Sequence, residues 1–221
     1  MKIKGVIFDL DGTLANTLED LKDSLNMAMT DLSLPLHNNE SVIKCLNNGM
    51  KMFVRRSVPE ELRTDELLEK VSLKYHHYYR LNHMNKTFFY DGINDLLHTL
   101  KAEFGLKIAV ISNKDNLYTK NIVNALDINH DVDVAYGFRD GIPHKPSPES
   151  VFGVMEELGI TKEETVFVGD SNVDVKTAAN AGIPSIGVLW GFKGRASFPE
   201  EQPNYLAEKP EDIKNILLEM K

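Results

Sequence analysis

The chain has 221 residues, 42% of them hydrophobic and 26% charged, which is typical of a globular protein with one large domain or a domain carrying an insertion. Its formal net charge of −8 argues against nucleic acid or an anionic membrane as the main partner. No apolar run reaches the roughly 18 residues needed to cross a bilayer. The first residues enter a strand instead of a signal region, and Cys45 is the only cysteine. These features predict a protein of the reducing cytoplasm with neither a membrane nor a nucleic-acid partner.

The first apolar segment of the chain ends in two aspartates. Residues 2–10 are predicted to form a strand buried on both faces, as in a parallel sheet, and a glycine turn follows Asp11. Asp9 and Asp11 would point to the same side of an extended chain and could share a hard cation. A calcium loop is excluded, because it needs glycine at its sixth position and an acidic ligand at its twelfth. The remaining alternative is a capped turn with two solvated aspartates.

From residue 15 to residue 85 the hydrophobic pattern is helical. Thr17 and Asp20 resemble a capping box at the start of the first helix. Pro35, the Asn47-Asn48-Gly49 sequence and Pro59 would then separate four helical stretches, at about residues 17–32, 40–46, 50–58 and 67–81. A simple crossover between parallel strands needs only a dozen or so residues. The pattern therefore predicts a helical domain, residues 15–85, inserted after the first strand.

Helices and strands alternate from residue 90 onward. The predicted strands are residues 106–111, 132–136, 165–168 and 184–189, and the predicted helices are residues 93–104, 116–126, 147–158, 174–181 and 210–220. This order predicts an α/β fold: a doubly wound, Rossmann-like, mostly parallel sheet with helices on both faces. The core domain would comprise residues 1–14 and 86–221.

Polar residues follow three further predicted strands. Ser112 can hold phosphate oxygens together with the backbone N–H groups after it, Lys145 lies in a proline-flanked approach to a helix, and Asp170 is followed by Asp174. Each has an ordinary alternative: a turn, a solvated lysine and a helix cap. Because the carboxyl ends of parallel strands share one edge of a sheet, we expect these groups to meet Asp9 in one site.

These residues resemble the sequence motifs of the haloacid dehalogenase-like superfamily, in particular its phosphoglycolate phosphatase-like branch. Asp9-Leu10-Asp11-Gly12-Thr13 is similar to the first motif, Ser112 to the second and Lys145 to the third, and Gly169-Asp170-Ser171 with Asp174 is similar to the fourth. The resemblance covers almost the whole chain, and the helical insertion falls where this branch carries a cap domain.

The resemblance implies a role for each residue. Asp9 would attack the substrate phosphorus and form an aspartyl-phosphate, and Asp11 would act first as general acid and then as general base. The predicted phosphate-binding residues are Ser112, Asn113 and Lys145. Mg²⁺ would be held by Asp9, the backbone carbonyl of Asp11 and Asp170, with Asp174 orienting the groups around the metal.

The implied function is a Mg²⁺-dependent phosphatase of a small phosphorylated metabolite. A phosphomutase similar to β-phosphoglucomutase, a pyrophosphatase of the same branch and a non-enzymatic binding protein are the alternatives. An acid at Asp11 argues against carbon–halogen and carbon–phosphorus cleavage, since the family members that carry out those reactions lack it. Lys51, Arg55 or Arg56, near the Gly49 break, is predicted to bind a carboxylate or second phosphate of the leaving group, although a solvated helix face is the alternative. Substrate and oligomeric state stay open.

Overall fold

The computed structural model describes residues 3–46, 49–199 and 202–220. The chain divides into two compact units, unit 1 (Met1–Ala15 and Phe89–Lys221) and unit 2 (Asn16–Phe88). The short strands β2 (Ala15–Asn16) and β3 (Phe88–Phe89) pair with each other where the chain passes between the units. Within the described ranges, none of the helices combines the length and the apolar character needed to cross a membrane.

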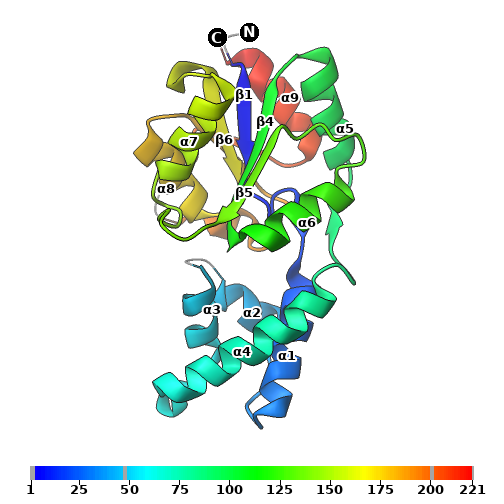
Figure 1. The fold of residues 1–221 in the computed structure, drawn as a ribbon. Helices are drawn as coiled ribbons and strands as arrows, with labels where there is room; N and C mark the ends of the chain where they lie inside the picture. Colours follow the sequence, from blue (N-terminus) through cyan, green and yellow to red (C-terminus); the bar gives the residue numbers. More distant parts are fainter. Residues whose placement is uncertain (1–2, 47–48, 200–201, 221) are drawn as a thin grey trace. The chain divides into compact units, whose positions relative to one another are not determined.

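Unit 1 is a six-stranded parallel sheet with the order β5-β4-β1-β6-β7-β8. Figure 1 shows α7 and α8 on one side of this sheet and α5 and α9 on the other. The predicted doubly wound α/β fold is therefore confirmed. The strands are β1 (Gly5–Phe8), β4 (Lys107–Asp115), β5 (Val134–Phe138), β6 (Thr165–Gly169), β7 (Ser185–Val188) and β8 (Tyr205–Ala207). The helices are α5 (Ile93–His98), α6 (Asn116–Leu126), α7 (Glu149–Leu158), α8 (Asn172–Ala181) and α9 (Pro210–Glu219).

The central strands are apolar on both faces because helices cover both. Every residue of β1 and of β6 is buried. On the α7 and α8 side, Ile7 and Phe167 pack with residues of those helices, including Val151, Met155 and Ala178. Burial of each large side chain contributes about 1.5–3 kcal/mol, so this contact stabilises unit 1.

The sheet register places the strand ends level with one another. Phe8 of β1 is opposite Val110 of β4 and Val168 of β6. Asp9 is thus the first residue after this row of paired residues, and Ser112 and Asp170 are the second residues after it in their own segments. Because chain order runs outward in both directions from β1, this edge is the topological switch point, where open α/β sheets bind ligands.

Several element boundaries differ from the sequence prediction. β4 does not end at residue 111 but continues to Asp115, with a register shift against β5 between Ile111 and Asp115. The first strand is shorter than residues 2–10, and the predicted helix 93–104 changes after His98 to a π-helical turn, Thr99–Glu103. The edge strand β8 was not predicted, since three residues carry too little pattern. Short 3₁₀ turns are formed by Glu60–Leu62, Lys162–Glu164 and Gly194–Ser197.

Unit 2 consists of helices α1 (Leu18–Asp31), α2 (Asn39–Cys45), α3 (Gly49–Ser57) and α4 (Asp65–Asn82). Its interior holds an aromatic group in which Tyr75 stacks on Tyr79 and meets Phe53 edge-on, both at 5.4 Å between ring centroids. The predicted interruption at Asn47-Asn48 lies outside the described residues.

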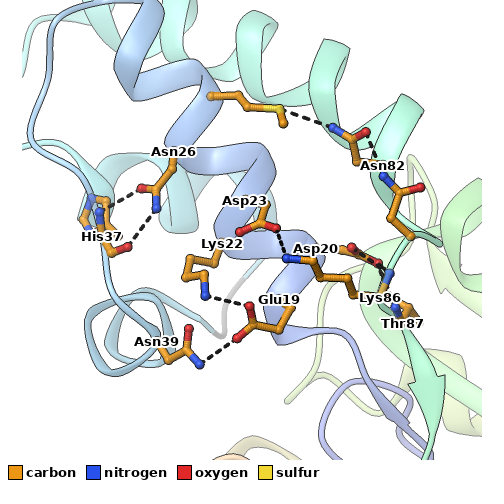
Figure 2. A network of polar contacts seen from close by, with 12 residues as sticks. Glu19, Asp20, Lys22, Asp23, Asn26, His37, Asn39, Asn82, Lys86 and Thr87 are labelled. Carbon is orange, nitrogen blue, oxygen red and sulfur yellow. Dashed lines mark hydrogen bonds and ion pairs between the residues drawn. The ribbon is translucent and has the colours of Figure 1, made fainter.

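The predicted capping box of α1 is wrong. The Asp20 carboxylate, 1% exposed, accepts hydrogen bonds from Lys86 N, Thr87 N and Thr87 Oγ1 at 2.8–3.0 Å. Figure 2 shows this group, in which Lys86 Nζ also contacts Asp23 at 2.6 Å. Asp20 therefore joins the start of α1 to the segment that leads out of unit 2.

Candidate active site

Among the described residues, three buried carboxylates meet at the carboxyl edge of the unit 1 sheet. Asp9 follows β1, Asp170 follows β6, and Asp174 lies in the first turn of α8. One oxygen from each lies within 4.8 Å of the others, and the residues are only 7%, 5% and 2% exposed. Burying carboxylates this close together is costly unless cations compensate them.

Lys145 supplies part of that compensation. Its Nζ lies 2.8 Å from Asp9 Oδ1 and 2.7 Å from Asp174 Oδ1, and its side chain is 4% exposed. Burial alone would lower the Lys145 pKa, but the carboxylates of Asp174 and Asp9 more than offset this, so the pKa lies above its usual value. The ammonium of Lys145 therefore stays charged beside two acids.

A single ammonium does not neutralise the group of carboxylates. Burial, followed by repulsion from Asp174, raises the pKa of Asp9 to about 7 although Lys145 opposes the shift. Burial and the charges of Asp174 and Asp9 also raise the pKa of Asp170 well above its usual range. Both shifts have one cause: too little positive charge and water around the acids. An all-oxygen donor set with excess negative charge fits a hard divalent cation.

The surroundings of Asp170 and Asp174 separate their roles. Asp174 has both oxygens engaged, Oδ1 by Lys145 and Oδ2 by Ser171 N at 3.1 Å and Ser171 Oγ at 2.6 Å. Asp170 Oδ2 accepts one bond, from Phe192 N at 3.1 Å. Gly12, with a φ of +84°, lies so close to Asp170 that any Cβ there would collide with the carboxylate. Asp170 is thus the better placed of the two to offer an oxygen to a cation.

The carboxylate of Asp11 lies outside this acidic group. Its Oδ1 is 3.0 Å from Lys114 Nζ, and its Oδ2 accepts a 3.4 Å bond from Ser112 Oγ. Both partners belong to the polar end of β4. The predicted metal contact of Asp11 concerns its backbone carbonyl, a different atom, and stays a prediction.

Lys114 is a site residue that the sequence prediction missed. The side chain is only 6% exposed, although a lysine directly after a strand is usually solvated. The feature of the sequence that could have indicated Lys114 is the run of polar residues from Ser112 to Asp115. In the structure this run continues β4, and its extended backbone places Lys114 in the site.

Asn113 and Ser112 were predicted to bind phosphate. Ser112 is 5% exposed at the sheet edge, and its Oγ also accepts a bond from Lys114 N at 3.2 Å. The Asn113 side chain turns instead to the main chain of Lys145, with Nδ2 donating to Lys145 O at 3.0 Å and Oδ1 accepting from Lys145 N at 2.8 Å.

The predicted specificity residues belong to unit 2. Lys51 and Arg55 are exposed on α3. Arg56, also considered from the sequence, donates from Nη1 to Leu46 O at 2.8 Å and so binds a free carbonyl at the end of α2. Its guanidinium therefore has a structural role.

Comparison with known proteins agrees with the class that this fold and site define, a doubly wound α/β protein with an acidic cluster at its switch point. Residues 6–188 match the sequence profile of the family described as haloacid dehalogenase-like hydrolase. Since this match spans most of the chain, the protein belongs to the haloacid dehalogenase-like hydrolase family. The predicted family and the prediction of a hydrolytic enzyme are confirmed.

Similar proteins are named as phosphatases. The phosphoglycolate phosphatase of Escherichia coli (strain K12) is 29% identical, over 96% of this chain and 91% of its own length. The phosphoglycolate phosphatase of Mannheimia succiniciproducens is 28% identical over 98% and 99%. Among solved structures, a predicted phosphoglycolate phosphatase from Haemophilus somnus 129PT superposes with a TM-score of 0.90 at 27% identity, covering 98% of this chain and 99% of that one. A predicted phosphatase from Clostridium acetobutylicum has a TM-score of 0.85 at 25% identity, with the same coverage.

Proposed function

We propose that this protein is a Mg²⁺-dependent phosphatase that hydrolyses a small phosphomonoester similar to phosphoglycolate. The names of the relatives and the composition of the site support this proposal. The single free cysteine, Cys45, fits a cytoplasmic enzyme.

The observation that carries the proposal is the different surroundings of Asp9 and Asp11. The Asp9 carboxylate lies in the acidic group with the Lys145 ammonium at 2.8 Å. The Asp11 carboxylate lies apart, held by Lys114 and Ser112. An anionic nucleophile attacking an anionic phosphate needs cations beside it, whereas the group that gives and takes a proton needs a position of its own, apart from the nucleophile. Two acids separated by one residue therefore suit two different tasks.

In the proposed reaction, an Asp9 oxygen bonds to the substrate phosphorus as the bond to the leaving oxygen breaks. Asp11, protonated at the start, gives its proton to that leaving oxygen, so an alcohol departs and an aspartyl-phosphate remains. Water then attacks the phosphorus while Asp11 accepts a proton from that water, and the bond between phosphorus and the Asp9 oxygen breaks. Inorganic phosphate leaves and both aspartates return to their first state. Lys145 and Ser112 would bind the phosphoryl oxygens.

Mg²⁺ is the proposed cation because carboxylate and carbonyl oxygens are its preferred ligands. Asp9, Asp170 and the backbone carbonyl of Asp11 would hold it, and Asp174 would orient Lys145 and Ser171 beside them. Bound there, the ion would offset the charge that accumulates between the carboxylate and the phosphate.

Unit 2 is proposed to be the cap domain that excludes water while the phosphoryl group is transferred. Within it, Lys51 and Arg55 are proposed to bind the anionic part of the leaving group, since both are exposed on α3. If Lys51→Ala and Arg55→Ala, made separately, both leave kcat/KM unchanged on the best substrate, this part of the proposal is wrong.

The main test is phosphate release from a panel of phosphomonoesters with and without Mg²⁺. The panel includes phosphoglycolate, pyrophosphate and a hexose 1-phosphate supplied with a hexose bisphosphate, so that a pyrophosphatase or a mutase is recognised by its product. We expect Mg²⁺-dependent release, and a loss of roughly 10³-fold or more in Asp9→Asn, since the nucleophile is removed. Asp65→Asn, an exposed aspartate at the start of α4, is the matched control. Turnover retained by Asp9→Asn refutes the nucleophile.

A further inference from the structure

The side chain of Asn113 makes a two-bond contact with the main chain of a residue 32 positions later. Its Nδ2 donates to Lys145 O at 3.0 Å, and its Oδ1 accepts from Lys145 N at 2.8 Å. A primary amide has one carbonyl oxygen and one NH₂ group, so this contact uses both ends of the side chain. The Lys145 main chain precedes Pro146 and is thus tied to β4 by a side chain instead of by a strand.

A second asparagine in the chain makes the same contact. In unit 2, Asn26 Nδ2 donates to His37 O and His37 N donates to Asn26 Oδ1, both at 2.8 Å. Figure 2 shows these two bonds, which fix the connection after α1 to the helix itself. Neither Asn26 nor His37 is among the residues proposed to take part in catalysis or binding. The repeated geometry shows what an asparagine used in this way does: it fixes the path of a loop main chain.

The two contacts differ in the residue whose main chain they hold, His37 in unit 2 and Lys145 in unit 1. The ammonium of Lys145 lies 2.8 Å from Asp9 and 2.7 Å from Asp174 and is almost completely buried. The position of this ammonium depends on where the Lys145 main chain lies, because the side chain is attached there and is held on both carboxylates. A displacement of about 1 Å of such a group can cost two orders of magnitude in rate.

We propose that Asn113 is a positioning residue, which sets the main chain of Lys145 so that the ammonium lies between Asp9 and Asp174, and that its side chain does not bind the phosphoryl group. This inference rests on the proposed phosphatase function and refines it. Of the two neighbours at the end of β4, Ser112 would contact the phosphoryl group and Asn113 would act through Lys145. Adjacent residues of a strand point to opposite sides, which fits these two different roles.

The test is a double-mutant cycle on kcat/KM with Asn113→Ala, Lys145→Ala and the double variant. We expect Lys145→Ala to lose about 10²–10³-fold, in the range seen when one electrostatic stabiliser is removed. Asn113→Ala alone should lose about 10–100-fold, mostly in kcat, because a misplaced ammonium shields the attack less well. In the Lys145→Ala background the same change should cost less than about 2-fold, since non-additivity identifies residues that act as a unit.

Asn26→Ala is the matched control, because it removes the same pair of bonds from a loop in unit 2. It should destabilise the protein to a similar degree and leave kcat/KM within about 2-fold of the wild type. Hydrogen exchange of the Lys145 amide gives a readout independent of turnover: it should accelerate in Asn113→Ala and not in Asn26→Ala. If Lys145→Ala does not fold, Lys145→Arg takes its place in the cycle.

Two results would overturn the inference. Losses that multiply in the double variant mean that Asn113 acts independently of Lys145, as a direct phosphate ligand would. An unchanged exchange rate at Lys145 means that the contact does not hold its main chain. If no phosphomonoester is turned over, the proposed function fails, and the same cycle is then measured as the dissociation constant of inorganic phosphate with Mg²⁺ present.

Discussion

Unit 1 and unit 2 both bury acidic side chains, but they compensate them in opposite ways. In unit 2 the Asp20 carboxylate receives hydrogen bonds from two backbone N–H groups and a hydroxyl. In unit 1 the carboxylates of Asp9, Asp170 and Asp174 lie within 4.8 Å of one another and share Lys145 as their neighbouring cation. Asp20 is satisfied by the folded chain itself. The acidic group of unit 1 is left in need of positive charge.

This difference shows how a buried carboxylate can be classified by its donors. A carboxylate with a full set of protein donors is a structural group, and its removal costs stability. Carboxylates that crowd one another cost stability in the free protein, and such an arrangement is typical of a site that binds a cation. Burial alone does not distinguish the two, since Asp20 and Asp170 are 1% and 5% exposed.

Asp170→Asn is the variant with the largest expected effect on the acidic group of unit 1. We expect phosphate release to fall by roughly 10³-fold, since a proposed metal ligand is lost. Without added metal, however, the variant should be more stable than the wild type by about 1 kcal/mol, because one of the crowded charges is removed. A phosphate-release assay measures the first effect, and thermal unfolding in EDTA and in excess MgCl₂ measures the second.

The wild type should gain stability with Mg²⁺, by about 2.7 kcal/mol when the ion is at 100 times its dissociation constant. Asp170→Asn should lose most of that gain, and the control Asp65→Asn should keep it. Equal stabilisation of all three proteins by Mg²⁺ would show that Asp170 is not a ligand.

Asp20→Ala tests the carboxylate of unit 2 that is compensated by hydrogen bonds. It leaves Lys86 N and Thr87 N without their buried acceptor, so we expect a loss of about 3 kcal/mol in the free energy of unfolding, from about 1–3 kcal/mol for each unsatisfied group. Thr87→Val removes only the hydroxyl donor and should cost about 1 kcal/mol. Urea denaturation measures both. The gain in stability with Mg²⁺ should be the same as in the wild type, and a smaller gain would link Asp20 to the metal site.

Lys114→Met tests the difference between Asp9 and Asp11 within unit 1. The change keeps most of the length of the side chain but removes the ammonium that holds Asp11 Oδ1 at 3.0 Å. Because a displaced proton donor transfers its proton less well, we expect a loss of about 10-fold in kcat on an alkyl phosphate, whose leaving group needs a proton. The loss on p-nitrophenyl phosphate should be smaller, because p-nitrophenolate leaves without one. Lys114→Arg should restore most of the rate. Equal losses on both substrates would mean that Lys114 does not act through Asp11.

Part of the site could be predicted because its signals are local. Asp9 and Asp170 each end a short apolar run, and the alternation of strands and helices places both at one edge of a parallel sheet. Both steps use only the period of the hydrophobic pattern and the direction of the chain. The fold class followed from the same signals, the family followed from the resemblance of the four motifs, and both are confirmed.

The contacts of the polar residues could not be predicted in this way. Asp20 was expected to cap its own helix, but its donors lie 66 and 67 residues away in the sequence. Asn113 was predicted to bind phosphate, with an ordinary turn as the alternative, and β4 was expected to end before Asn113 and Lys114, although it continues through both. A polar side chain has several partners of similar energy within its reach, and local sequence carries no information about which of them folding brings near.

Local sequence was thus enough to predict the parallel α/β sheet, the run of helices after the first strand and the acids at the strand ends, since hydrophobic periodicity and motif spacing are properties of neighbouring residues. Only the tertiary structure decided that Asp9 lies among carboxylates while Asp11 lies with Lys114, and that Asn113 holds the main chain of Lys145. The physical reason is that charge compensation depends on distances of about 3 Å between residues far apart in the chain, which the packing of the sheet and its loops sets.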